Sequence, residues 1–321
     1  MKKTLIFLSF SLLIFFIGIQ RMASVSALMN DGETTSDNEV DPIDISAFRD
    51  NTYYRQLNRW LLTYDPIALP TEISPISLTY SWNPLITYVT QPDYDQDVAL
   101  LSEDDSIEYV VTVESTGLYE LGFDFKMVEN YYTIPSIEVS INGSIPFTEC
   151  ADLELDVSWD KVPLDEAVRY NRYGNELLPK SASVFEWKTM FFDDFNAYTN
   201  NPYLFLLHEG VNTITLKALN LSVYVGDLTI RGQQSLNDYA HYQSLYASNT
   251  STEEPKQITV QGEAFDRKND LEVKASYYKE SAMTPYTYKH TVLNQLDGAS
   301  MSRGGSKVTY EFDVESTGFY Q

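Results

Sequence analysis

The sequence has little of several residue types that particular classes of protein require. It contains one cysteine, Cys150, in 321 residues, which excludes an internal disulfide and a zinc site built from several thiolates. Basic residues are also few, because 22 Lys and Arg stand against 46 Asp and Glu for a formal net charge of −24. Nucleic-acid binding needs a basic face, so we expect no nucleic-acid partner. The chain instead has 24 Tyr, 16 Phe and 4 Trp, which favour strands and can stack on sugar rings.

The N-terminal segment has the pattern of an export signal. Two lysines precede an apolar run at 5–19, and small residues at 25–27 suit cleavage. The run of about 15 residues is shorter than the roughly 20 that a membrane-spanning helix needs. We therefore predict a signal peptide at 1–27 and a secreted or cell-surface protein, with an uncleaved anchor as the alternative. The polar, acidic residues 28–45 predict a flexible leader.

The middle of the chain alternates with the period of two that is typical of half-buried strands. Apolar alternation occurs in six segments: 107–113, 118–125, 137–141, 203–207, 213–219 and 223–230. Turn sequences at Asn142-Gly143 and at 209–212 predict hairpins. A helical stripe from Tyr53 to Tyr64 precedes the strands and ends before Pro66. We predict an all-β fold, an antiparallel β-sandwich or jelly roll with a short preceding helix.

An internal repeat predicts a second copy of this module. YVVTVESTGLY at 109–119 and YEFDVESTGFY at 310–320 share seven residues in eleven positions. Residues 258–264 (ITVQGEA) have the pattern of an opening strand for the second copy. Because this copy stops soon after its turn, we expect it to be incomplete and the sequence to be part of a longer protein. A disordered or docking tail is the alternative.

These patterns predict five regions along the chain. They are a signal peptide at 1–27, a flexible leader at 28–45, a helix plus the first module at 46–235, a short helix and linker at 236–256, and a truncated second module at 257–321.

Four segments in order resemble a known family: STGLYELGFDF, PSIEVSINGSIPF, YGNELLPKSASVFEW and LLHEGVNTITLKA. They are similar to galactose-binding-like jelly rolls of carbohydrate-binding module families 6 and 35, above all those repeated at the N-terminus of Gram-positive extracellular solute-binding proteins of sugar ABC transporters. The resemblance implies a non-catalytic, extracellular module region that binds a glycan or oligosaccharide. It also implies a membrane permease as a partner, reached through a domain outside this sequence. Gly117, Tyr119, Asn142, Gly143, Gly210 and Asn212 match fold markers of the family.

A sugar site needs a flat apolar face and fixed hydrogen-bond partners for hydroxyl groups. Trp159, Tyr173, Asn175 and Trp187 lie in the loop-rich stretch 151–202, where binding residues tend to occur. We predict that these four residues bind the ligand. The alternative for each Trp is packing in the core, which we favour for Trp82.

The sequence contains two candidate calcium sites. The resemblance implies structural calcium at Glu263, which matches a calcium-holding position of related modules, and no other cofactor is expected. Asp93, Asp95 and Asp97 imitate the start of a calcium loop, but Val98 stands where the tight turn needs Gly, so a solvated acidic loop is favoured.

The sequence predicts no catalytic residue. His208, His241 and His290 are scattered, and neither a Gly-x-Ser-x-Gly elbow nor a His-Glu-x-x-His motif occurs. Cys150 has no His near it in sequence, so it is expected to pack as a small hydrophobe. Besides glycan binding, two functions stay open: a structural spacer on the cell surface, or an ancillary domain of a secreted glycoside hydrolase.

Overall fold

The chain divides into two compact units, Met1–Ile45 and Ser46–Gln321, and the structure describes residues of the second. The computed structural model describes residues 51–68, 72–76, 85–162, 168–196, 198–199, 201–233, 238–245 and 257–315. The predicted signal peptide and leader, Trp82 and the last residues of the repeat lie outside the described residues. Within these ranges, no helix combines the length and the hydropathy needed to cross a membrane.

Helix α3, Tyr53–Trp60, confirms the predicted helix but is one turn shorter than the apolar stripe. Tyr53 and Trp60 are buried, whereas Leu61 caps the helix and is 46% exposed. The Tyr53 ring lies 4.9 Å from that of Phe147 and 4.4 Å from that of Tyr203. These contacts pack the helix against the end of the sandwich, since Tyr53 Oη also accepts a hydrogen bond from the Leu204 N–H at 3.0 Å.

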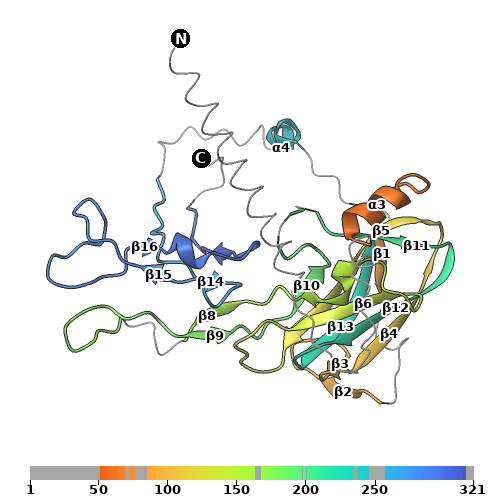
Figure 1. Ribbon diagram of the computed structural model, residues 1–321, viewed down its shortest axis with the longest axis horizontal. Coiled ribbons are helices and arrows are strands. Elements are labelled where there is room, and N and C mark those ends of the chain that lie inside the picture. Colours follow the sequence, from red (N-terminus) through yellow and green to blue (C-terminus); the bar gives the residue numbers. More distant parts are fainter. Residues whose placement is uncertain are drawn as a thin grey trace, which may run out of the picture. The chain divides into compact units, whose positions relative to one another are not determined.

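Two antiparallel sheets form the sandwich, which confirms the predicted all-β class (Figure 1). In the described residues the first sheet contains β1 (Glu72–Ile76), β2 (Thr87–Thr90), β3 (Asp97–Leu101), β5 (Gly117–Met127), β10 (Lys188–Phe191), β11 (Leu204–Leu207) and β13 (Val223–Arg231). Its order is β10-β5-β13-β3-β2, with β1 also on β13 and β11 also on β5. The second sheet has the order β4-β12-β6-β7, from Ser106–Val113, Gly210–Ala218, Ser136–Ile141 and Leu153–Glu154.

The core lies between these two sheets and follows the predicted alternation. In β4, Ile107, Tyr109, Val111 and Val113 are buried while the residues between them are exposed. Tyr109 reaches across the core, and its Oη donates to the Gly226 carbonyl of β13 at 2.7 Å. Each apolar face is therefore covered by the opposite sheet.

Cys150 packs as a small hydrophobe, as predicted. It lies in the 3₁₀ helix η2, Thr148–Ala151, and is fully buried in the core. Burial raises the pKa of its thiol well above the ordinary value, so the group is a thiol and a poor nucleophile at neutral pH.

The turn at Asn142-Gly143 forms, but residues 144–147 do not form the return strand that the predicted hairpin requires. Both turn residues have positive φ, 51° and 76°, as a type I′ turn requires. After a single bridge between Ile141 and Ser144, the chain carries Phe147 into the core and enters η2. Strand β6 pairs instead with β12 and β7.

The predicted hairpin at 209–212 is also wrong. Strand β11 pairs with β5 in the first sheet, whereas β12 pairs with β4 and β6 in the second. Gly210 (φ +94°) begins the crossing, and the buried Asn212 side chain accepts from the His208 N–H and donates to its carbonyl. The turn residues therefore join two sheets instead of two neighbouring strands.

Residues 257–315 pack on the loop-rich stretch of the first module. A third sheet has the order β17-β14-β8-β9, from Val308–Thr309, Arg267–Lys268, Trp159–Lys161 and Ser181–Ser183, and β15 (Ala275–Ser276) pairs with β16 (Gln295–Leu296). Helices α4 (Tyr239–Leu245) and η4 (Gly298–Ser300) complete the described elements, and α4 confirms the short helix predicted in 236–246. The five-region division of the chain stays a prediction.

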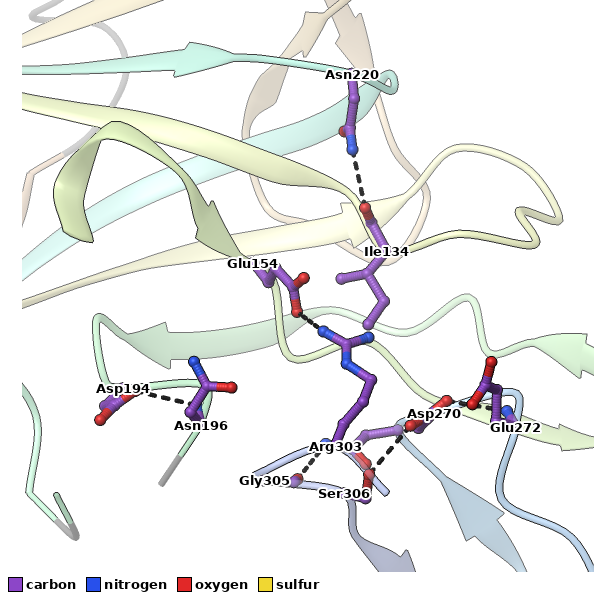
Figure 2. A network of polar contacts seen from close by, with 11 residues as sticks. Ile134, Glu154, Asp194, Asn196, Asn220, Asp270, Glu272, Arg303, Gly305 and Ser306 are labelled. Carbon is purple, nitrogen blue, oxygen red and sulfur yellow. Dashed lines mark hydrogen bonds and ion pairs between the residues drawn. The ribbon is translucent and has the colours of Figure 1, made fainter. Parts of the chain in front are cut away.

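Polar contacts anchor the loop 303–307 to the first module (Figure 2). Arg303 donates a hydrogen bond to the Glu154 carboxylate, and its guanidinium lies 4.6 Å from the centroid of the Phe195 ring. Ser306 Oγ donates to Asp270 Oδ2 at 3.0 Å. The loop is thus held to the first module by Glu154 and Phe195, and to its own segment by Asp270.

The strands predicted for the second copy are absent from the described residues. The predicted opening strand at 258–264 is irregular and mostly exposed, and 310–315 also forms no strand. Phe312 and Val314 are 59% and 50% exposed, whereas their repeat equivalents Val111 and Val113 are buried. The equivalents belong to β4, which pairs with β12. Within the described residues no strand equivalent to β12 lies beside 310–315. The repeated pattern alone therefore does not produce a strand.

Candidate functional site

The structure disperses the four residues predicted to bind ligand. Trp159 is 1% exposed in β8, and its Nε1 donates to the Tyr131 carbonyl at 3.0 Å. A sugar needs an exposed ring face for stacking, so the core-packing alternative describes Trp159 and the binding role predicted for it is corrected.

Tyr173 and Asn175 lie in a turn that contacts residues 290–293. Tyr173 is 63% exposed, whereas Asn175 Oδ1 accepts from the Thr291 N–H at 2.8 Å. Asn175 therefore has a structural task in holding two loops together, and Tyr173 offers an open ring.

Trp187 lies on a different surface, the outer face of the first sheet, beside Tyr94. The two half-buried rings have centroids 4.3 Å apart at 41°. Trp187 Nε1 donates to Asp93 Oδ1 at 3.3 Å. The segment DYDQD, for which the sequence predicted a solvated acidic loop, thus supplies both an aromatic and a carboxylate partner to Trp187.

Tyr94 is fixed by the strands beneath it. Its Oη donates to Asp124 Oδ2 at 2.8 Å and accepts from the Asp227 N–H at 2.9 Å. The hydroxyl occupies space that a side chain at Gly226 would fill, since a Cβ there would lie 2.4 Å from Tyr94 Oη. Burial, followed by the Asp124 and Asp227 charges, raises the pKa of Tyr94, so its phenol keeps its proton.

Charged groups border the ring pair. Lys126 Nζ lies 2.6 Å from Asp93 Oδ2, and this hydrogen bond lowers the pKa of Asp93. Thr189 Oγ1 donates to Asp124 Oδ1 at 2.5 Å. We call this surface the Tyr94–Trp187 face and define it by these residues: Asp93, Tyr94, Asp124, Lys126, Trp187, Thr189 and Asp227.

Sequence reasoning identified only Trp187 of this face as a ligand-binding residue, and it named Asp93 only as part of a solvated acidic loop. Two signals were present: an aromatic residue inside the acidic run 93–97, and the polar side of the alternation in β5, where Asp124 and Lys126 follow buried neighbours. The pairing of β10 with β5, which sets Thr189 opposite Asp124, could not be read from either. Chemically, the face combines an apolar platform with ionised acceptors and one cation.

A cavity of about 540 Å³ lies between the β8–β9 region and residues 263–275. Phe265, Leu271 and Val273 form part of its apolar wall, with the edge of Trp159. Glu263 also lines it, and Glu263 Oε2 is buried without a hydrogen-bond partner. Such an oxygen suits a cation, but the described part of the chain contains no group of three or more His, Cys, Asp or Glu that could hold a metal. The surroundings of Glu263 therefore do not fit a calcium site built from several carboxylates.

No known protein family matches the chain, and no curated protein matches it. Solved structures with a similar arrangement include a family 35 carbohydrate-binding module from Clostridium thermocellum (15% identity, TM-score 0.28, covering 49% of this chain and 98% of the module). A CBM6 module of lichenase 5A from Cellvibrio mixtus, in complex with cellotriose, has 11% identity and a TM-score of 0.27 over 50% of this chain and 98% of the module.

A third structure, a GH26-CBM35 β-(1,4)-mannanase from Podospora anserina, has 12% identity and a TM-score of 0.33. The match covers 52% of this chain and 28% of the mannanase. At these values the likeness carries no weight for function, which is argued below from the geometry of the face.

Proposed function

We propose that this chain is a non-catalytic carbohydrate-binding region whose Tyr94–Trp187 face holds a neutral glycan. The observation that carries the proposal is the half-buried Trp187 ring, bonded at Nε1 to an ionised Asp93 and packed on Tyr94. An aromatic ring receives the C–H side of a sugar, and carboxylates accept hydrogen bonds from its hydroxyl groups.

The backbone beneath this face supports preorganisation. Asp124 lies on β5, Thr189 on β10 and Asp227 on β13, three adjacent strands of one sheet. Side chains held by paired strands and by their own hydrogen bonds lose little freedom when a ligand binds. The face also carries three carboxylates, Asp93, Asp124 and Asp227, against the single ammonium of Lys126. A neutral glycan fits this charge better than an anionic one.

Calorimetric titration of the full chain with neutral polysaccharides such as β-glucan, mannan and xylan tests the proposal. Trp187→Ala should weaken binding at least tenfold, which corresponds to about 1.4 kcal/mol. Phe185→Ala is the matched control, because Phe185 is a 47% exposed ring in the same β9–β10 connection. This variant should bind the glycan as tightly as the parent does.

A second variant guards against a folding effect. Asp93→Asn keeps the shape of the face and removes a charged acceptor, so it should weaken binding, while the loss of the exposed ion pair with Lys126 should lower the unfolding midpoint only slightly. Unchanged affinity in both Trp187→Ala and Asp93→Asn, or no binding of any neutral glycan by the folded parent, would refute the proposal.

The location of the protein, its transport partner and its lack of catalytic activity are proposals as well. Following the family resemblance, the region would act outside the cytoplasm and hand its glycan to a sugar permease. N-terminal sequencing of protein from the producing cells should find a chain that starts after Ala27, and a cytoplasmic chain that keeps its Met1 would contradict this. Release of reducing sugar ends from a bound glycan would contradict the non-catalytic assignment.

A further inference from the structure

The cavity between the β8–β9 region and residues 263–275 has no part in the proposed function. Its wall includes residues of β8 and β9 and residues of β14 and β15. Its volume of about 540 Å³ lies within the range of about 300–1,000 Å³ that is typical of small-molecule sites. An apolar cavity of about 150 Å³ is enough to hold benzene, so this one has room for a ligand of one or two rings.

Much of the cavity wall is apolar. Its apolar lining includes Leu177, Leu178, Phe265, Leu271, Val273 and Leu293. Two of these side chains, Phe265 and Val273, are buried, so the cavity reaches into the packed part of residues 257–315. A ligand with an apolar body would be stabilised by leaving water for this wall.

One hydrogen-bond acceptor in the wall has no partner. Glu263 lines the cavity as a half-buried side chain, and its Oε2 is shielded from solvent without a hydrogen bond. A shielded acceptor that is left unpaired costs free energy, which a donor on a ligand would recover. The terminal torsion of a glutamate side chain is broad, so a small rotation of the carboxylate presents either oxygen to a donor inside the cavity.

Three other charged groups of the lining are already engaged in hydrogen bonds within the chain. The Lys268 ammonium donates to two backbone carbonyls at 2.8 and 2.6 Å. Glu176 Oε2 accepts from the Leu293 N–H at 2.8 Å. Asp266 Oδ2 accepts from the Glu311 N–H at 2.6 Å. A sugar would bring several hydroxyl groups into the cavity, and each one left unpaired would cost free energy, so a ligand with a single donor fits better.

A neutral donor also fits the wall better than a charged one. Lys161 and Lys268 line the cavity, with Lys161 Nζ 6.0 Å from the Phe265 ring centroid. Their ammonium groups repel a cationic ligand, and the Glu263 carboxylate repels an anionic one. We infer that the cavity binds a small neutral alcohol with an apolar body, such as a phenol, whose hydroxyl donates to Glu263. The site shares no residue with the Tyr94–Trp187 face.

p-Cresol and 4-methylanisole are a matched pair of probes, because they differ only in the methyl group that replaces the hydroxyl hydrogen. We expect the full chain to bind p-cresol saturably in calorimetry. It should bind 4-methylanisole at least tenfold more weakly, because a hydrogen bond to an ionised acceptor is a strong one. Glu263→Leu removes the acceptor and keeps a side chain of similar size, so it should bind the two probes within about twofold of each other.

The folding of this variant is checked by urea unfolding. Its midpoint should not fall, because the group that is lost is an unpaired acceptor. Glu263→Gln keeps the shape of the side chain and offers a neutral acceptor. It should bind p-cresol more weakly than the parent and more tightly than Glu263→Leu, and this order would not follow from a loss of folding.

NMR spectroscopy locates the bound probe. The indole N–H signal of Trp159 should shift when p-cresol binds, because Trp159 lines the cavity. The signal of Trp187 should stay, and each signal is assigned by its loss on substitution with Phe. Glu103→Leu is the control variant, because it removes the same charge from an exposed position outside the cavity. It should change the affinity for p-cresol less than twofold.

Several results would overturn the inference. These are equal affinity of the parent for the two probes, no saturable binding of p-cresol, and equal losses of affinity in Glu103→Leu and Glu263→Leu. Tighter binding of benzylammonium than of p-cresol, or displacement of p-cresol by cellobiose, would overturn it in favour of a cationic or a sugar ligand. Trp187→Ala should bind p-cresol as the parent does, so this test is independent of the neutral-glycan proposal.

Discussion

Replacement of Trp159 by alanine should lower the free energy of unfolding by about 4 kcal/mol. The ring is 1% exposed and its Nε1 is bonded to the Tyr131 carbonyl. A buried Trp removes roughly 200 Å² from water, which at about 25 cal/mol per Å² is worth around 5 kcal/mol. Alanine retains a small part of this, and measured Trp→Ala changes in cores are about 3–5 kcal/mol.

Urea unfolding of the full chain, followed by circular dichroism, measures this loss as a lower midpoint at an unchanged slope. Trp187→Ala is the comparison, because that ring is half-buried on the outer face. It should cost less than about 2 kcal/mol, which covers the contact with Tyr94 and a partial burial. Equal losses in the two variants, or a loss below about 1 kcal/mol for Trp159→Ala, would refute the assignment of the two rings to core and surface.

Three further results are expected. Gly226→Ala should weaken neutral-glycan binding in calorimetry, because its Cβ would lie 2.4 Å from Tyr94 Oη and displace the ring; parent-like binding would contradict the role of this glycine. Burial raises the pKa of Asp193 above 3.8, so the native state holds its proton more tightly, and the parent should lose stability relative to Asp193→Asn as pH rises from 3.8 through the raised pKa. If the difference in unfolding free energy between the parent and Asp193→Asn, measured in urea, does not change with pH, the raised pKa of Asp193 is contradicted. Gly305→Ala should speed hydrogen exchange in residues 303–309, because its Cβ would lie 1.7 Å from the Phe195 carbonyl oxygen; unchanged exchange would contradict the docked loop.

Much of the sandwich could be predicted because it depends on local patterns. The alternation at 107–113 became β4 with the expected residues inside, and Asn142-Gly143 adopted the left-handed turn that its residue types favour. A strand with one buried face and one solvent-exposed face alternates apolar and polar residues, and this alternation can be read from consecutive positions in the sequence.

The partnerships of the strands could not be predicted in the same way. The sequence 204–218 reads as two strands around a glycine turn, yet β11 and β12 belong to different sheets. The second repeat shows the same limit, since YEFDV at 310–314 matches the pattern of β4 and forms no strand. Strand formation needs a neighbour for its backbone groups, and the neighbour of β4 lies about a hundred residues further along the chain.

The sequence by itself determined the all-β class, the helix before it, the acidic balance and the aromatic content of this protein. These follow from composition and from spacings within a few residues. Tertiary structure alone decided which aromatic rings are open: it buried Trp159, left Trp187 on a face with Tyr94, and brought the turn around Tyr173 beside residues 290–293. The physical reason is that exposure depends on what packs over a ring, and that covering comes from segments far away in the chain.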